Sequence, residues 1–117
     1  MTLVDSSVWI EHFRHADQDL AGLLDAEQVL MHPFVLGELS LGQFRERDSV
    51  LQKLRLLEAM PLLPENEVAD FVRHFRLWGR GIGWIDCHLM ASARDSRSQL
   101  LTRDKALKAA WLHVRKN

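Results

Sequence analysis

Two carboxylates inside strongly apolar segments are the first residues of this chain that could do chemistry. Glu38 lies in residues 33–41, a segment so apolar that it has no clearly polar side, and Asp86 lies in the similar segment 83–91. Helical spacing places apolar neighbours on both sides of each carboxylate, so we expect both side chains to face inward. Burying an unpaired carboxylate is costly, and a positive group must therefore meet each of them.

Two further carboxylates follow short apolar segments that are typical of strands. Asp5 ends the segment 2–5, and Asp104 comes just after the segment 99–102. In an open parallel sheet, ligands bind beyond the carboxyl ends of the strands. If these two strands are neighbours, Asp5 and Asp104 reach one cleft, and Glu38 and Asp86 point into it from helices. Such an all-oxygen site suits Mg²⁺, with Mn²⁺ as an alternative.

Each carboxylate also has a purely structural explanation. The two that end strands are good helix N-caps, and the other two have arginines such as Arg80 and Arg94 as possible partners. The four together are harder to explain in this way. Carboxylates about 5 Å apart repel one another by about 3 kcal/mol per pair at an effective dielectric constant of ~20. A cluster of three or four would therefore need a cation to stay ionised.

Short strands that alternate with helices must position these side chains. The pattern predicts a parallel sheet covered on both faces, a three-layer α/β/α architecture, in one domain over residues 1–117. Strands are expected at 2–5, 28–31, 62–63 and 99–102, with a last short strand at 112–114 as an option. Helices are expected from residue 6 or 7, then at 19–26, 33–44, 48–60, 65–78, 85–96 and 105–111.

The composition excludes several classes of protein. A chain of 117 residues that is 47% hydrophobic and 26% charged folds as one globular domain. No apolar run approaches the ~18 to 20 residues that span a bilayer, and early charges at Asp5 and Glu11 argue against a secretory signal. We therefore expect a cytoplasmic protein. The single cysteine, Cys87, excludes an internal disulfide and a thiolate zinc site.

Charge is divided unevenly along the chain. Residues 1–69 hold five Lys and Arg against twelve Asp and Glu, a net −7, whereas residues 70–117 hold ten against four, a net +6. Eleven of the fifteen basic residues are arginine, whose planar guanidinium matches phosphate oxygens. A polyanionic partner is thus plausible, although solvated helix faces explain any single arginine equally well.

Four short motifs resemble those of the PIN-domain ribonucleases, and within these the VapC-type toxins of bacterial toxin–antitoxin pairs. They are Asp5 to Ile10, Gly37 to Leu39, Trp84 to Ala91 around Asp86, and Leu101 to Asp104. The resemblance covers nearly the whole chain. It implies a parallel sheet with the first strand at its centre, Mg²⁺-dependent endoribonuclease activity, a VapB-like antitoxin and a homodimer. Unpaired RNA is the expected target, because a small cleft cannot read bases inside an A-form helix.

The resemblance also implies roles for individual residues. Asp5 and Asp86 correspond to principal metal ligands, Asp104 to a direct or water-mediated ligand, and Glu38 to a ligand or a group that orients the attacking water. Ser6 and Thr102 match hydroxyl residues that line the family's site. The family often has a further Asp two residues after the fourth acid and then an aromatic residue, where this chain has Ala106 and Leu107. This departure leaves the number of fully occupied metal sites, one or two, open and does not affect the first.

The motifs leave open the role of two arginines and the choice between two functions. Arg80 and Arg103 are nearest the motifs among the basic residues, and we expect them to hold phosphates that flank the cleaved bond. The alternative to a nuclease is a catalytically silent α/β domain whose exposed apolar helices serve only protein association.

Overall fold

Four parallel strands form a single sheet in the computed structural model, which describes residues 1–117. The strands are β1 (Thr2–Val4), β2 (Val29–Met31), β3 (Glu58–Ala59) and β4 (Gln99–Leu101), in the order β3-β2-β1-β4. Leu3 lies opposite Leu30 on one side and Leu100 on the other. The first strand is therefore central, and the strands that precede Asp5 and Asp104 are neighbours, as the sequence predicted.

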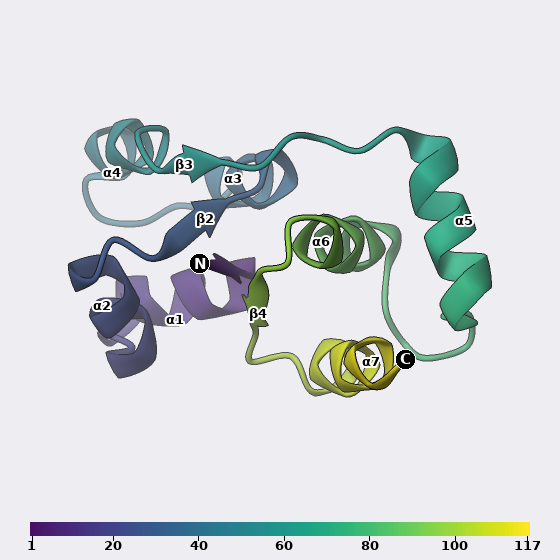
Figure 1. The fold of residues 1–117 in the computed structure, drawn as a ribbon. Helices are drawn as coiled ribbons and strands as arrows, with labels where there is room; N and C mark the ends of the chain where they lie inside the picture. The colour runs from purple at the N-terminus through teal and green to yellow at the C-terminus, as the bar shows by residue number, and fades with distance from the viewer.

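Seven helices surround the sheet and confirm the α/β class. In Figure 1 the strands run through the middle, with α1 and α2 on one side and α6 and α7 on the other. Helix α6 packs directly against β1 and β4. No helix combines the length and the apolar character needed to cross a membrane. The helices are α1 (Ser6–Arg14), α2 (Gln18–Asp25), α3 (Pro33–Ser40), α4 (Arg47–Leu54), α5 (Glu65–Phe75), α6 (Trp84–Asp95) and α7 (Lys105–Lys116).

The core is built on the two inner strands. Leu3 and Val4 of β1 are fully buried, and all three residues of β2 are buried as well. Strands covered on both faces are apolar at successive positions, which is why these segments are readable in the sequence. Helix α6 contributes a run of seven buried residues from Cys87 to Ala93. This helix is thereby fixed against the sheet, and Asp86 comes immediately before its buried run.

The third strand lies earlier than the expected 62–63. It is Glu58–Ala59, and the expected helix 48–60 ends at Leu54. Leu30 and Met31 pair with these two residues, and the Met60 amide donates to the Met31 carbonyl at 2.9 Å. Pro61 follows and has no N–H to extend the ladder. The apolar residues at 54, 57 and 60 have helical spacing, which is why a helix was expected there. Both residues of the strand, Glu58 and Ala59, are exposed, so the strand has no apolar pattern of its own.

The C-terminal segment is helical, so the optional strand at 112–114 is wrong. Helix α7 continues from Lys105 to Lys116. Leu107 and Val114 are both fully buried seven residues apart, which is the two-turn spacing of one helix face. Leu112 is 46% exposed, as a residue on the opposite face should be. Leu112 and Val114 therefore lie on different faces of one helix, and their two-residue spacing is not that of a strand.

Candidate functional site

Asp5 lies at the carboxyl end of β1 and is 6% exposed. Its carboxylate accepts three hydrogen bonds of 2.8 Å: one from the Ser6 amide, one from the Ser7 hydroxyl and one from the Thr102 hydroxyl. The Asp5 amide donates to the Leu101 carbonyl at 2.9 Å, which continues the β1–β4 pairing. This pairing brings Thr102 to Asp5 from 97 residues away and fixes the orientation of the carboxylate.

Asp104 follows in the turn between β4 and α7. Its amide donates to Thr102 Oγ1 at 3.0 Å, and its Oδ1 accepts from the Leu107 amide at 2.9 Å. Asp104 is therefore the N-cap of α7. Its second oxygen, Oδ2, makes no hydrogen bond within the protein, so one oxygen remains available to a ligand.

Asp86 reaches the same region from the first turn of α6. Its Oδ2 accepts from the Gly83 amide at 3.1 Å, while Oδ1 makes no hydrogen bond. Burial raises the pKa of Asp86, and the carboxylates of Asp5 and Asp104 raise it further, against the opposing effect of the Gly83 amide. The Asp86 side chain is thus within electrostatic reach of both.

Glu38 lies on α3 as an exposed residue, and not as the inward-facing carboxylate that its apolar segment predicted. Partial burial is the largest cause that raises its pKa, followed by the negative charges of Asp5 and Asp86, while a hydrogen bond with Ser6 opposes the shift. The charges that raise these pKa values connect the four predicted acids: Asp5 acts on Glu38 and Asp86, Asp86 acts on Glu38, and Asp104 acts on Asp86. Ser6 and Thr102 contact this group as well, since the Ser6 amide and the Thr102 hydroxyl both donate to the Asp5 carboxylate.

Arginine partners do not explain the acidic cluster. None of the four acids takes part in an ion pair. Arg80 instead donates to the Arg76 carbonyl at 3.2 Å, and the Arg94 guanidinium lies over the Phe75 ring at 4.8 Å. The Arg80 side chain is solvent-exposed, and its contact with phosphate stays a prediction.

Arg103 makes ion pairs within the protein, and the phosphate contact expected of it stays a prediction. Its guanidinium donates three hydrogen bonds to Asp17, at 2.8 to 3.1 Å, and one to Asp19 at 2.9 Å. Burial acts to raise the pKa of Asp17, but the hydrogen bonds and charge of Arg103 and the Leu20 amide bring it below its usual value. Arg103 therefore ties the start of α2 to the turn after β4.

Two residues in this arrangement were not assigned a role from the sequence. Ser7 donates to Asp5, and its Oγ accepts from the Arg103 amide at 3.0 Å. Its place two residues after a strand-end aspartate is the only sequence signal for this contact. Asp17 is 86 residues from Arg103 along the chain, and no local pattern pairs the two.

A cluster of aromatic and imidazole rings lies beside the acids. His32, which is completely buried, is the N-cap of α3: its Nδ1 accepts from the Phe34 amide at 3.0 Å. Burial, with the nearby His88, lowers the pKa of His32 to about 4. Trp84 is 43% exposed and packs edge-on against His88 with ring centroids 5.1 Å apart. Both histidines are neutral near pH 7, because burial lowers the pKa of each.

The acidic cluster has the donor chemistry for a hard divalent cation. As they stand in the structure, no three acidic, histidine or cysteine side chains converge closely enough to hold one metal ion. Asp86 and Asp104 each keep one carboxylate oxygen without a hydrogen bond, and the raised pKa values of Glu38 and Asp86 report a local excess of negative charge. Oxygen donors with a net negative charge fit Mg²⁺ or Mn²⁺.

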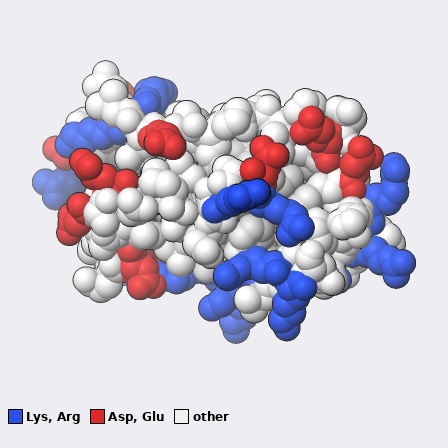
Figure 2. All heavy atoms as spheres, viewed as in Figure 1, with Lys and Arg blue, Asp and Glu red and all other residues white.

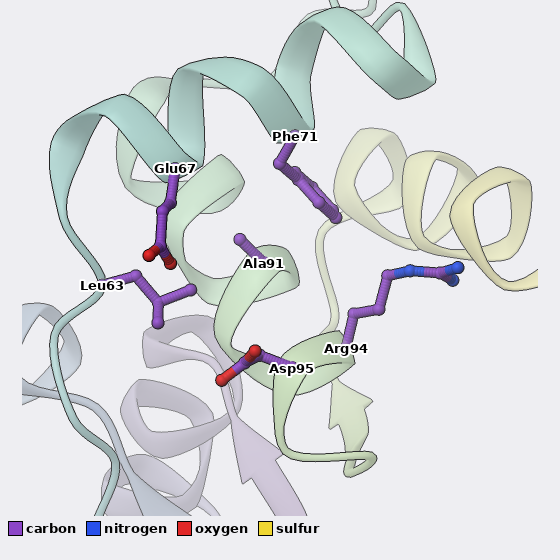
Figure 3. A pocket seen from close by; sticks show the side chains of 6 residues that line it. All are labelled: Leu63, Glu67, Phe71, Ala91, Arg94 and Asp95. Atoms are coloured by element: carbon purple, nitrogen blue, oxygen red, sulfur yellow. The ribbon is translucent and has the colours of Figure 1, made fainter.

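A pocket of about 380 Å³ lies elsewhere, between α5 and α6 (Figure 3). It is lined by Leu63, Glu67, Phe71, Ala91, Arg94 and Asp95, and contains none of the four acids. Its charged residues carry both signs, and its arginine also donates to the Val114 carbonyl at 3.4 Å. We assign it no part in the acidic site.

Comparison with known proteins gives one family and several relatives. The PIN domain model matches residues 2–111. Ribonuclease VapC32 of Mycobacterium tuberculosis, found in strains H37Rv and CDC 1551, is 48% identical over 111 residues, which cover 94% of this chain and 90% of that protein.

Two crystal structures share the fold at low sequence identity. PAE2754 from Pyrobaculum aerophilum superposes with a TM-score of 0.67 at 18% identity, covering 99% of this chain and 96% of that one. FitAcB from Neisseria gonorrhoeae gives 0.62 at 20% identity, with 95% and 93% covered. The match to the family model over nearly the whole chain and the identity to a VapC ribonuclease show that this chain belongs to the PIN domain family as a VapC-like member.

Proposed function

We propose that the protein is a divalent-metal-dependent endoribonuclease and the toxin of a bacterial toxin–antitoxin pair. The observation that carries the nuclease proposal is the group of four carboxylates around the end of β1, in which Glu38 and Asp86 have raised pKa values. The relative at 48% identity is named a ribonuclease, which favours RNA as the substrate.

Asp5, Asp86 and Asp104 are the residues that would hold Mg²⁺ or Mn²⁺. Asp86 Oδ1 and Asp104 Oδ2 are free of hydrogen bonds, and Asp5 has one remaining acceptor position, since a carboxylate has about four such positions and three are used. When bound, such an ion supplies the positive charge that favours ionisation of water near neutral pH and stabilises charge developing on the phosphate.

The chain's own groups supply position and proton transfer. Ser7 and Thr102 hold the Asp5 carboxylate in one orientation through their 2.8 Å hydrogen bonds. Glu38, whose pKa is raised, is the group that would orient the attacking water and accept its proton. The exposed face of the site suits unpaired RNA, because a small protein cleft cannot read bases inside an A-form helix.

An RNA cleavage assay tests the nuclease proposal. We expect purified protein to cleave single-stranded RNA with Mg²⁺ or Mn²⁺, to lose activity in EDTA, and to lose at least about 100-fold in kcat on Asp86→Asn. Asp95→Asn is the matched control: Asp95 is exposed on the same helix, away from the cluster, and its variant keeps wild-type activity. Cleavage that survives EDTA or Asp86→Asn contradicts the assignment.

The toxin role and its partners are supported separately. A pocket of about 440 Å³ between α1, α2 and α4 is mainly apolar and is lined by Trp9, Phe13, Leu24, Val50 and Leu54. This pocket offers a VapB-type antitoxin an apolar surface to bind. The resemblance to VapC proteins favours a homodimer. Co-expression with a VapB-like antitoxin should relieve toxicity. Light scattering should give twice the 13.5 kDa chain mass.

The alternative of a silent association domain makes a different prediction in the same assays. It expects protein binding through the apolar pocket, no RNA cleavage with any divalent ion, and no difference between wild type and Asp86→Asn. The crowding of Glu38 and Asp86 with other carboxylates has no purpose in that case. We therefore favour the nuclease.

A further inference from the structure

A pocket of about 440 Å³, separate from the two described above, lies between α1 and the loop of residues 41–46. Its walls are Ile10, Phe13 and Arg14 of α1, and Gly42, Phe44 and Arg45 of the loop. No acidic residue lines it. We call it the arginine pocket.

The loop wall of the arginine pocket is held in place by specific contacts. Phe44 stacks on Phe13 with ring centroids 4.5 Å apart and planes only 18° from parallel. The Arg47 guanidinium donates to the Gly42 carbonyl at 3.2 Å and also to the Ser40 carbonyl. The pocket is therefore formed before any ligand arrives, which lowers the entropic cost of binding.

Two unpaired guanidinium groups give the arginine pocket its charge. Arg14 and Arg45 are both exposed, and neither takes part in an ion pair or a side-chain hydrogen bond, whereas the four ion pairs of the chain use Arg47, Arg73 and Arg103. The surrounding half of the chain, residues 1–69, has a net charge of −7. Two free arginines that face one pocket in this acidic half mark a site for an anion.

The arginine pocket adjoins the acidic site along α1 and α3. Helix α1 begins at Ser6 beside Asp5, and Arg14 lies eight residues later, about 12 Å along the helix axis. Helix α3, which packs against α1, carries Glu38 and leads directly into the loop that holds Arg45. A strand of RNA that leaves the acidic site in this direction reaches both arginines within a few nucleotides.

We propose that the arginine pocket binds the phosphodiester backbone of single-stranded RNA next to the cleaved bond, with Arg14 and Arg45 contacting phosphate oxygens. The proposal rests on the nuclease function proposed above. Backbone contacts of this kind position the substrate without reading its sequence. Because the guanidinium groups act on binding and not on the reacting atoms, their loss raises KM and leaves kcat nearly unchanged.

The test combines cleavage kinetics with salt-dependent binding. We expect the double variant Arg14→Gln/Arg45→Gln to raise KM for a single-stranded RNA about tenfold, with kcat within about twofold of wild type. Binding is measured by fluorescence anisotropy in the Asp86→Asn background, where the RNA is not cut. Loss of two phosphate contacts should reduce the slope of log K against log salt by about 1.4, at ~0.7 per phosphate on single strands.

Arg55→Gln is the matched control, because Arg55 is also exposed and unpaired but lies next to β3, toward the edge where the strands begin. It should leave KM and the salt slope unchanged. Equal KM and slope for the double variant and wild type overturn the proposal, even if RNA is cleaved normally. Reduced binding of a protein partner with unchanged RNA binding also overturns it. If the wild type cleaves no RNA with Mg²⁺ or Mn²⁺, the proposed function fails and this proposal fails with it.

Discussion

Acidification should destabilise the fold through one buried imidazole, that of His32. This residue caps α3, the helix that carries Glu38, and it has no solvent exposure. Its Nδ1 accepts the Phe34 amide, and its Nε2 has no partner. Burial and the neighbouring His88 lower the pKa of His32 to about 4. A proton on this ring would also disrupt the cap, because Nδ1 could no longer accept.

The sign and size of the effect follow from proton linkage. The unfolded chain protonates His32 near its ordinary value of 6.5, whereas the folded protein resists protonation down to about pH 4. Between these values the unfolded state binds more protons, so stability is full above pH 6.5 and is lost as the pH falls. The loss is about 2 kcal/mol between pH 7 and pH 5, and about 3 kcal/mol when the titration is complete.

Urea unfolding at pH 7 and pH 5 measures this loss, with His32→Asn as the comparison. Asparagine has a side-chain oxygen that can accept the Phe34 amide at the same cap position, but it does not titrate. Glu38 and Asp86 have raised pKa values and act in the opposite direction, because the folded state holds their protons more tightly. They are present in both proteins and cancel in the difference. Wild type should lose about 2 kcal/mol more than the variant.

Two results would refute this reasoning. One is an equal loss of stability in wild type and His32→Asn between pH 7 and pH 5. The other is an NMR titration in which the His32 ring of the folded protein protonates near pH 6.5. His15→Asn is the control, since His15 is exposed, and it should change stability equally at both pH values.

Three further predictions concern the contacts around the acidic site. Arg103→Gln should lower the unfolding free energy by about 1 to 2 kcal/mol, because it leaves the 7% exposed Asp17 carboxylate without its partner. Arg73→Gln, at a well exposed ion pair, should lower it by less than about 0.5 kcal/mol. Urea unfolding measures both. Asp104→Asn should keep the helix cap and remain within about 0.5 kcal/mol of wild type but lose RNA cleavage, whereas Asp104→Ala should lose cleavage and about 1 kcal/mol more of stability. Millimolar Mg²⁺ should raise the melting temperature of wild type by several degrees in differential scanning fluorimetry but not that of Asp86→Asn, and an equal rise in both would place the ion elsewhere.

The sequence predicted those parts of the fold that depend on continuous burial. Three of the four strands were found from short apolar runs. The inner strands β1 and β2 are buried, as Leu3 and Val4 are, while β4 at the edge keeps only Leu100 buried. The third strand was misplaced because Glu58 and Ala59 are both exposed. Its position is decided by pairing with β2, a contact between segments about 28 residues apart that no local pattern records.

The contacts of the candidate site were also predictable only in part. The convergence of Asp5 and Asp104 was predictable, since both follow strands and parallel strands end at one edge. The ion pair between Arg103 and Asp17 was not predictable, because Asp17 lies 86 residues away and serves also as the N-cap of α2. An arginine next to a motif has no sequence mark that separates a phosphate contact from an internal ion pair. Only the packing of α2 against the β4–α7 turn decides between them.

Helix capping and ion binding are compatible roles for these acids. Asp5 caps α1, Asp104 caps α7, and Asp86 accepts the Gly83 amide at the start of α6. Each of these three carboxylates therefore lies at a helix N-terminus, which is equivalent to roughly +0.5 of an elementary charge. Together the N-termini offset part of the repulsion among the carboxylates, so the cluster can form before a cation is present. Because capping needs an oxygen while ion binding needs charge, replacing Asp with Asn separates the two roles, as replacing it with Ala does not.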